Sequence, residues 1–534
     1  MSDQIWDYII IGGGSAGCVM ANRLSTNPQT RVLLLDAGVS NRAPSLKIPA
    51  GMISAISQDK YNWKYPAAPD ASRGGLRDHW SAGKAIGGGS AINGMLYIRG
   101  HKSDYERWAQ LGCTGWDYAS ILPHFKLIET FEGGADEFRG RRGPQSVSLA
   151  RHRLPLVDKA VQAAVACGHA LNADYNGERQ SGVGYAQNSQ KSGRRHSSAS
   201  AFLAPVKGRK NLSVILGAQA THITFDGKRA SGAGFHHNGA QHIASCKGEV
   251  IICAGAMGSP KLLMHSGIGP AQMLKALGLD VLIDAPQTGE NLMEHPAIYL
   301  TAKTSLASLN AAAHPVKLPW VMANWFLRGR GAASNGAASA QVLCRSRDGL
   351  AAPDIQLLFT PALFDYDPVK KKARLRRENG LSIAALALQP QARGCIRLTS
   401  QNPLAPPLIE HELLGCQADI DGLVSAARKA LEIFTQMDRD RLIVSLDPDL
   451  TPDSPKEAFE DYIRASAFRG DHASGTCRMG SDAKAVVDPQ LCVRGVAGLR
   501  VADASIMPVI PSGNTNAPVL MIAEKAASMI LKSQ

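Results

Sequence analysis

The sequence predicts an α/β protein (α+β overall) whose nucleotide-binding domain is discontinuous along the chain. Three observations predict this fold. A G-x-G-x-x-G turn lies between a strand and a helix near the N-terminus, units of strand, glycine loop and helix recur in the middle and at the end, and the 534 residues leave room for two to four domains. The residues between these units then form insertions that build a second domain.

The first 40 residues carry the most specific motif. Asp7–Ile11 is predicted as a strand, Gly12-Gly13-Gly14-Ser15-Ala16-Gly17 as the turn, and the pattern after it as a helix through Leu24. A second strand, Val32–Leu35, ends at Asp36, 19 residues after the last glycine of the turn. Because strand, turn, helix and acid occur in the required order, this pattern is far more specific than a lone glycine motif.

Each residue type in this motif has a physical role. Gly12 permits the tight turn, Gly14 lets a pyrophosphate approach the backbone, and Gly17 lets the helix pack on the strand. Asp36 can hold a ribose hydroxyl, and the helix N-terminus faces the phosphate charge. One bound dinucleotide is therefore predicted, and the motif alone does not distinguish NAD from FAD.

Further glycine-rich segments lie downstream. The most glycine-dense is predicted to be a loop whose backbone amides lie against a ligand, since glycine disfavours helix and strand interiors. The predicted segments are the loop Ser81–Gly94, the strand Val250–Cys253 with the helix Lys261–His265, the segment Gly289–Pro296, the strand Leu499–Ala502 closed by Asp503, and the loop Pro511–Pro518 before an apolar helix through Leu531.

Composition excludes several classes of protein. Hydrophobic residues at 45% and charged residues at 19% are ordinary for a globular protein with a large core and argue against disorder. Aromatic residues are modest at 6%, and no nucleic-acid-binding motif is present. No apolar run reaches the roughly 18 residues of a membrane span. We therefore expect a soluble protein with no nucleic-acid partner.

The N-terminus and the cysteines favour a cytoplasmic location. Apolar residues begin at Ile5 without a basic leader or a small-residue cleavage site before them. The ten cysteines include no C-x-x-C pair, which argues against a zinc ribbon or a dithiol centre. We expect reduced thiols and no metal site.

A net charge of +13 arises partly from one basic run, Lys370–Arg377. Such a run can attract nucleic acid, an anionic lipid surface, an acidic substrate or an acidic electron-accepting partner. A solvated loop is the simpler interpretation. Peripheral contact of this run with the inner face of a membrane stays open as the alternative.

Four stretches of the chain resemble the sequence blocks of glucose–methanol–choline (GMC) flavoprotein oxidoreductases, and the resemblance extends from Asp7 to Lys525. The chain is similar to the choline-dehydrogenase-like bacterial branch of that family. The matching blocks are the first signature in Gly83–Gly94, the second signature in Gly255–Gly269, the active-site block in Asp471–Gly480, and the block of the second catalytic residue in Gly513–Pro518.

The resemblance implies the domain organisation. A Rossmann-like FAD-binding domain would comprise residues 1–155, 211–297 and 476–534, the last part carrying the active-site loop. A substrate-binding domain with an antiparallel sheet would comprise residues 156–210 and 298–475.

The resemblance also implies the cofactor, FAD. In some members a histidine in the first signature binds the flavin covalently, and because Ile92 stands at that position here we expect dissociable FAD. The expected contacts are Gly12, Gly14, Ser15, Ala16, Gly17, Asp36, Ala37, Gly88, Asn93, Gly94, Met95, Leu96, Ala220, Ala254, Asp503, Ala504, Asn514 and Thr515.

Oxidation of an alcohol requires a base for the hydroxyl proton and a cofactor that accepts hydride. The resemblance implies that His472 is this base, and an imidazole with an ordinary pKa of about 6.5 suits the task. It implies that Asn516 is the second catalytic residue, which orients the substrate oxygen without titrating. Asp471 could point into the pocket, where it would raise the pKa of the histidine or select hydroxylated substrates, or point outward, and both orientations stay open.

The resulting hypothesis is oxidation of a primary alcohol, either aryl or medium-length aliphatic, or of an aldehyde hydrate, with electrons passed to a quinone-like carrier. An oxygen-using aryl-alcohol or hydroxymethylfurfural-type oxidase is the alternative. A lyase or a photodecarboxylase on the same fold is more remote, and it stays open because a fold does not fix a reaction. The motifs do not identify the alcohol, the acceptor or the oligomeric state.

Overall fold

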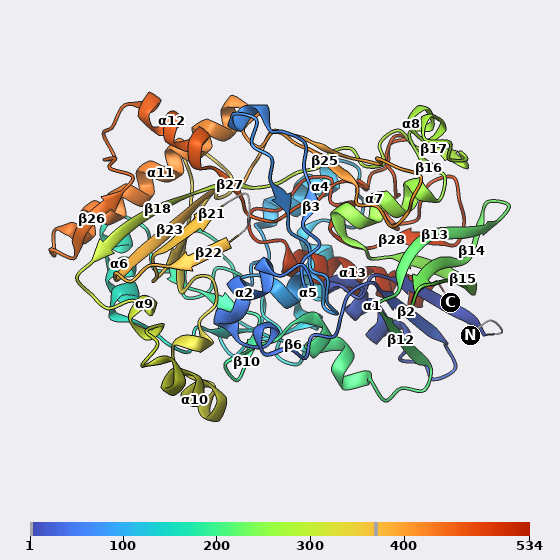
Figure 1. Ribbon diagram of the computed structural model, residues 1–534, viewed down its shortest axis with the longest axis horizontal. Helices are drawn as coiled ribbons and strands as arrows, with labels where there is room; N and C mark the ends of the chain where they lie inside the picture. Colours follow the sequence, from blue (N-terminus) through green and yellow to red (C-terminus); the bar gives the residue numbers. More distant parts are fainter. Residues whose placement is uncertain (1–3, 368–371, 534) are drawn as a thin grey trace.

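The computed structural model describes residues 4–367 and 372–533 and contains two seven-stranded sheets, which lie at opposite ends of the view in Figure 1. The first sheet has the strand order β12-β2-β1-β15-β14-β13, with β28 beside β15. Its strands are β1 (Ile5–Ile11), β2 (Val32–Asp36), β12 (Leu212–Leu216), β13 (Gln219–Asp226), β14 (Arg229–His237), β15 (Ala240–Ile252) and β28 (Leu499–Val501).

The first sheet is parallel in its central part. β1 pairs in parallel with both β2 and β15, β12 extends the sheet beyond β2, and β28 pairs in parallel with the end of β15. The long strand β15 also pairs antiparallel with β14, and β14 with β13, which forms a separate antiparallel flap. Parallel strands that are buried on both faces are uniformly apolar, and β2 is buried at all five positions.

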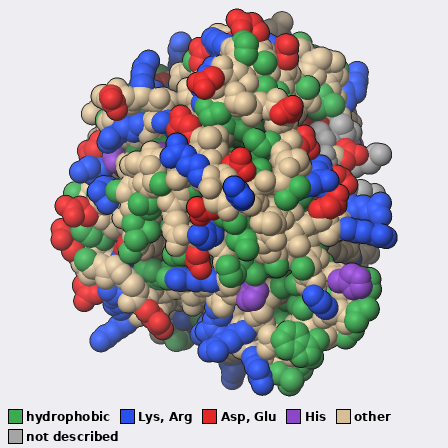
Figure 2. All heavy atoms as spheres, turned by 90° about the vertical axis from the view of Figure 1, so that its left-hand side faces the viewer, with side chains coloured by type: hydrophobic (Ala, Val, Ile, Leu, Met, Phe, Trp, Pro, Cys, Tyr) green, Lys and Arg blue, Asp and Glu red, His purple; other side chains and the backbone are tan. Residues whose placement is uncertain are grey.

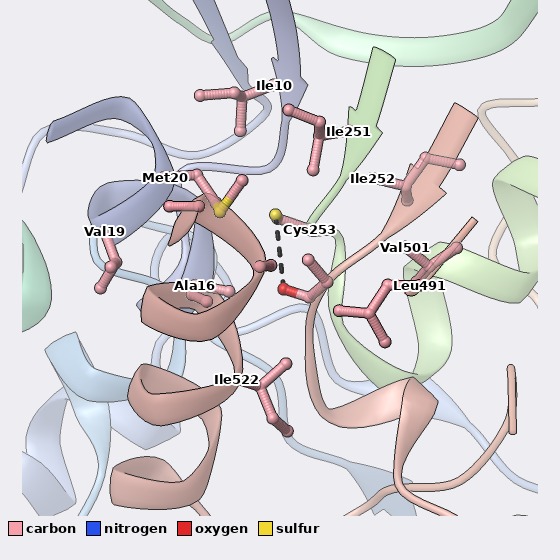
Figure 3. Close-up of a cluster of buried hydrophobic side chains, with 14 of the residues drawn as sticks. Ile10, Ala16, Val19, Met20, Ile251, Ile252, Cys253, Leu491, Val501 and Ile522 are labelled. Atoms are coloured by element: carbon pink, nitrogen blue, oxygen red, sulfur yellow. Dashed lines mark hydrogen bonds between the residues drawn. The ribbon is translucent and has the colours of Figure 1, made fainter. Parts of the chain in front are cut away.

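Two helices from opposite ends of the chain pack together beside this sheet. Helix α1 (Ser15–Leu24) contacts α13 (Asn516–Lys532), and both contribute side chains to one core with β1, β15 and β28. Figure 3 shows side chains of this cluster from α1 (Met20), β15 (Ile251) and α13 (Ile522), and the Cys253 thiol lies 3.5 Å from the carbonyl oxygen of Ala502. This core fixes the N-termini of both helices at the same edge of the sheet.

The second sheet is antiparallel throughout, with the order β26-β18-β23-β20-β19-β8 and β27 beside β18. Helices α6 (Pro155–Ala166), α11 (Gln417–Asp438) and α12 (Lys456–Ser466) cover one face. The strands are β8 (Gly182–Tyr185), β18 (Pro296–Thr304), β19 (Ala340–Cys344), β20 (Ile355–Thr360), β23 (Gly380–Ala387), β26 (Ile443–Asp447) and β27 (Phe468–Arg469).

The two faces of the second sheet have different neighbours because successive side chains in a strand point to opposite sides. In β18, Ile298 and Leu300 pack against the helices, whereas Ala297 and Tyr299 line a large cavity on the other side. The sheet is therefore a wall between a helical core and the cavity.

The predicted α/β class and the antiparallel sheet in the second part are confirmed. The strands of the first sheet fall within residues 1–155, 211–297 and 476–534, and those of the second sheet lie in the other segments apart from the first residues of β18. The exact division into domains stays a prediction. The described helices include none that is long and apolar enough to cross a membrane.

Two local expectations were wrong. Ser81–Gly94 was expected to be a loop throughout, but Gly89–Ile92 forms a one-turn helix, α3. Helix α7 runs from Gly255 to His265 and so begins six residues before the expected Lys261. Pro260 cannot donate a hydrogen bond to the Ala256 carbonyl, and the Thr476 hydroxyl donates to that oxygen instead (2.6 Å), which lets the helix continue through the proline.

Candidate active site

A cavity of about 1010 Å³ lies against both sheets, and every cofactor contact expected from the sequence lines it except Gly17. The two expected catalytic residues, His472 and Asn516, line the same cavity. The residues that were separated by hundreds of positions in the sequence are thus brought into one site.

The glycine positions show how closely the backbones approach one another at the nucleotide end. A Cβ atom on Gly12 would lie 2.4 Å from the carbonyl oxygen of Cys253, and one on Gly17 would lie 1.9 Å from the carbonyl oxygen of Gly12. Gly17 therefore packs α1 onto the turn and does not line the cavity, and its place among the cofactor contacts stays a prediction. Gly14 is different, because no atom comes nearer than 3.8 Å to its Cβ position.

The two glycine-rich loops rest on each other. The Gly87 amide donates to the Gly13 carbonyl oxygen (2.7 Å), and a Cβ atom on Gly88 would lie 2.7 Å from the Cα atom of Gly14. Gly88 also has φ +52°, a conformation that favours glycine. The loops form a cradle of bare backbone at the N-terminus of α1, which fits the pyrophosphate of a dinucleotide.

Two buried carboxylates hold this cradle in place. Asp36 accepts hydrogen bonds from the Gly13 amide (2.7 Å) and the Gly38 amide (2.8 Å). Asp503 accepts from the Gly255 amide (2.8 Å), the first residue of α7. Burial raises the pKa of Asp36. Each oxygen of Asp36 accepts one of these bonds and keeps a second lone pair, so Asp36 can still bind a ribose hydroxyl.

His472 lies at the other end of the cavity, and its ring nitrogens have defined partners. Its Nδ1 is 3.0 Å from Nδ1 of His295, and its Nε2 is 2.8 Å from the side-chain amide nitrogen of Asn514. His295 Nε2 is 3.2 Å from the Leu388 carbonyl oxygen, which can only accept, so this nitrogen carries the proton. In the neutral ring His295 Nδ1 must then accept from His472 Nδ1, which leaves the lone pair of His472 on Nε2.

The amide beside the base in this structure is that of Asn514, and the role of Asn516 as the second catalytic residue stays a prediction. Asn516 is the first residue of α13, and its Oδ1 accepts from the Ser15 hydroxyl (2.8 Å) in the first turn of α1. Because α1 and α13 pack together, this first turn faces the nucleotide cradle. Asn514 precedes the helix and is oriented by Gln356, which donates to its Oδ1 (3.2 Å).

The buried position of the site keeps both imidazoles neutral. Burial lowers the pKa of His472 to about 4, against a smaller opposing effect of Asp471. Burial and the neighbouring His472 lower the pKa of His295 well below its ordinary value. Asp471 lines the cavity, which favours the inward one of its two expected orientations.

Sequence reasoning missed the support behind the base. The Glu294 carboxylate accepts from the backbone amides of His295 (2.9 Å) and His472 (2.8 Å), and burial together with Asp471 raises its pKa to about 8. Glu294 and His295 belong to the segment Gly289–Pro296, which was noticed only for its position between motifs. The sequence signal that could have identified these supporting residues is a Glu-His pair directly before a strand.

A buried cation behind the second glycine loop was also missed. Arg195 is 3% exposed, and its guanidinium donates to Asn93 Oδ1 (2.9 Å) and to the Ser90 carbonyl oxygen (3.2 Å). Its remaining side-chain nitrogens have no hydrogen-bond partner in the described part of the chain. Burial lowers the pKa of Arg195 to about 9. The arginine fixes the amide orientation of Asn93, a predicted cofactor contact.

Comparison with known proteins agrees with this arrangement. The family described as GMC oxidoreductase matches residues 6–297 and 390–523. The chain belongs to the GMC oxidoreductase family. It is 37% identical to mitochondrial choline dehydrogenase of Homo sapiens, over 98% of this chain and 89% of that protein, and 38% identical to oxygen-dependent choline dehydrogenase of Sinorhizobium fredii, over 99% and 96%.

Solved structures show the same fold. Pyridoxine 4-oxidase from Mesorbium loti superposes with a TM-score of 0.87 at 29% identity and covers 98% of both chains. Formate oxidase has a TM-score of 0.91 at 24% identity, covering 100% of this chain and 99% of that chain.

The protein is therefore a flavoprotein oxidoreductase with FAD as its cofactor, acting on CH–OH donors. The cradle of the glycine loops fits the FAD pyrophosphate, because glycines leave bare backbone where these loops line the cavity, and a Cβ on Gly14 would fill the space that separates it from the Cα atom of Gly88 (3.8 Å). The side-chain amide nitrogen of Asn516 also fits, since it is buried in the cavity wall without a hydrogen-bond partner in the described part of the chain.

Proposed function

We propose that this protein oxidises a primary alcohol, aryl or medium-length aliphatic, or the hydrate of an aldehyde. One observation carries the proposal: the lone pair of His472 Nε2 and the amide of Asn514 meet at a cavity that has a largely apolar wall beside them. That wall includes Leu358, Ala384 and Leu386 of the second sheet. An apolar wall favours an uncharged hydrocarbon group next to the reacting hydroxyl.

The chain's own residues would perform the proton chemistry. The Asn514 amide and His472 Nε2, which are 2.8 Å apart in this structure, would separate to admit the alcohol oxygen, so that Nε2 accepts the hydroxyl proton and the amide donates to the oxygen. His295 Nδ1 accepts the Nδ1 hydrogen of His472, which stabilises the imidazolium that forms and keeps the ring in the active orientation. FAD, when bound, supplies the acceptor for hydride from the alcohol carbon.

A quinone-like carrier is the proposed electron acceptor, and molecular oxygen is the alternative. The relatives carry names of both kinds, choline dehydrogenase and pyridoxine 4-oxidase. No feature of the cavity distinguishes the two. A lyase or photodecarboxylase stays the more remote alternative, and the neutral base beside an amide donor favours alcohol oxidation over both.

Choline-like cations form a second candidate class of substrate. The relatives named choline dehydrogenase suggest it, and the cavity offers a carboxylate, Asp471, together with the stacked rings of Tyr299 and Phe468, whose centroids are 4.4 Å apart. Aromatic faces and a carboxylate are the groups that recognise quaternary ammonium.

Anaerobic mixing with a panel of alcohols tests the function. We expect benzyl alcohol or 1-octanol to bleach the flavin absorbance in the dark, and bleaching by choline alone would favour the second candidate. Rapid recovery in air with peroxide formation would identify an oxidase, and slow recovery rescued by a quinone would identify a dehydrogenase. If no alcohol bleaches the flavin, the proposal is wrong.

We also propose a cytoplasmic location, supported by ten cysteines that are all free thiols. The predicted membrane contact at Lys370–Arg377 falls partly outside the described residues. Within the described part, Arg376 pairs with Asp365 (2.7 Å), which reduces the positive charge that this segment offers to a membrane.

A further inference from the structure

Helix α10 (Leu318–Arg328) is apolar on both of its faces. On the inner face Val321 and Trp325 are buried, and the Trp325 indole donates to the Gly193 carbonyl oxygen (2.8 Å). On the outer face Trp320 is 71% exposed, Phe326 68% and Leu327 78%. A helix on a solvated surface normally carries polar residues on its outer face, so this one has an unpartnered apolar face.

The apolar face is bordered only by positive charge along the chain. Lys317 precedes α10, Arg328 ends it, and Arg330 follows, whereas residues 305–347 contain no aspartate or glutamate. Val316, in the turn before the helix, is 81% exposed. Arg194 adds a further cation, with its guanidinium 4.8 Å from the ring centroid of Trp325.

This part of the molecule projects from the surface. Helix α10 lies at the lower left of Figure 1, away from both sheets. Figure 2, which faces the left-hand side of that view, shows hydrophobic side chains gathered at the lower right with Lys and Arg side chains beside them. The inner residues Val321 and Trp325 fix the helix to the body, so the outer side chains form a preformed, protruding surface.

We propose that α10 and the turn before it dock on an anionic lipid surface. Tryptophan, phenylalanine and leucine on one helix face with lysine and arginine at its border are typical of helices that lie in the membrane interface. The cations would attract anionic headgroups while the apolar side chains enter the boundary of the acyl chains. With 11 residues the helix has about half the length of a membrane span, so it would lie in the interface and not cross it.

Charge complementarity favours lipid over a second copy of this chain. A symmetric dimer through this face would bring Lys317, Arg328 and Arg330 of both copies together, and like charges across an interface are costly. An anionic bilayer supplies both the apolar phase and the counter-charge that this face lacks.

Docking would also place the cavity beside the membrane. Leu318, Val321 and Met322 of α10 line the cavity wall. If the proposed function holds, an apolar alcohol could pass from the bilayer along α10 to His472. This consequence rests on the proposed function, whereas lipid docking itself does not.

Vesicle flotation of the full-length holoenzyme, without substrate, tests the proposal. We expect the protein to float with vesicles of equal parts phosphatidylcholine and phosphatidylglycerol and much less with phosphatidylcholine alone. The triple variant Trp320→Ser, Phe326→Ser, Leu327→Ser should bind at least about tenfold more weakly, because three apolar side chains no longer enter the bilayer. A matched control, Leu171→Ser, Ile243→Ser, Val444→Ser, removes side chains that are 61%, 64% and 68% exposed and should bind like the wild type.

A second variant separates the contribution of positive charge to vesicle binding from that of the apolar side chains. Arg328→Glu with Arg330→Glu should remove the preference for anionic vesicles. The proposal is overturned if the wild type does not bind these vesicles, or if the triple variant binds as well as the control. It is also overturned if sedimentation shows a wild-type dimer that the triple variant dissociates while vesicle binding is absent, because the face would then bind a second copy. Flavin reduction by alcohols is measured separately, so failure of lipid docking leaves the proposed function standing.

Discussion

The two ends of the cavity are built on different principles. At the nucleotide end the wall is bare backbone, and a single added Cβ at Gly12 would lie 2.4 Å from the carbonyl oxygen of Cys253. At the substrate end the wall is made of side chains such as Leu358 and Leu386, which project from the inner strands β20 and β23, each paired on both sides. Backbone contacts admit one residue type, whereas side-chain walls admit many. The first end therefore specifies a cofactor shared by a family, and the second can vary between its members.

The largest effect is expected at the substrate end. His472→Ala should lower the rate of flavin reduction by about 10³-fold, because the lone pair that accepts the hydroxyl proton is lost. FAD content should not change, since no nucleotide contact is touched. Stopped-flow reduction and the flavin-to-protein absorbance ratio measure the two quantities. Unchanged reduction would remove His472 from the mechanism, and loss of FAD would show that the two ends are not independent.

A change at the nucleotide end should cause loss of FAD, whereas the change at His472 should leave FAD bound. Gly17→Ala forces a Cβ into the Gly12 carbonyl oxygen, so we expect destabilisation on the order of 3 kcal/mol and loss of FAD. Gly208→Ala is the matched control, because its added Cβ meets no atom within 4 Å and its φ is not positive. Thermal unfolding and retained FAD report the result. Equal stability of the two variants would contradict the predicted clash between a Cβ at Gly17 and the Gly12 carbonyl oxygen.

Two asparagines two residues apart provide a sharper comparison. Asn514→Ala should lower kcat/KM by roughly 30-fold, about 2 kcal/mol, through loss of the donor to the substrate oxygen, with FAD retained. Asn516→Ala should mainly weaken FAD binding, because its side chain faces Ser15 and the cradle. Steady-state kinetics at saturating FAD and FAD titration of the apoprotein separate the two effects. The reverse pattern would support Asn516 as the second catalytic residue, as the family resemblance implies.

The nucleotide end of the cavity could be predicted from the sequence more fully than the substrate end. The cradle was predictable because Gly12, Gly14 and Gly88 are required by backbone geometry, which leaves a fixed pattern of glycines. The contact of His295 with His472 joins residues 177 positions apart and depends on how the second sheet sets the loop after β27, so no local pattern contains it. The choice between Asn514 and Asn516 depended on the residue at which α13 begins, and helix boundaries are poorly fixed by local sequence.

The smallest effect should come from Asp471. This carboxylate raises the pKa of His472, so Asp471→Asn should lower that pKa further below about 4. Because the base acts in its neutral form, which dominates above its pKa, the acid limb of kcat/KM should move to lower pH by less than about one unit. Activity towards an uncharged alcohol at pH 7 should not change. Asparagine tolerates the positive φ of +59° at this position, so the backbone should be preserved.

The same variant, Asp471→Asn, distinguishes the two candidate classes of substrate, uncharged alcohols and choline-like cations. If Asp471 acts only through the pKa of His472, kcat/KM for benzyl alcohol and for choline should respond alike. If it binds a quaternary ammonium group, KM for choline alone should rise, by about tenfold for the loss of a charge partner. Asp226→Asn, on the exposed end of β13, controls for the change in net charge. An acid limb that moves to higher pH would contradict the assigned influence of Asp471 on the base.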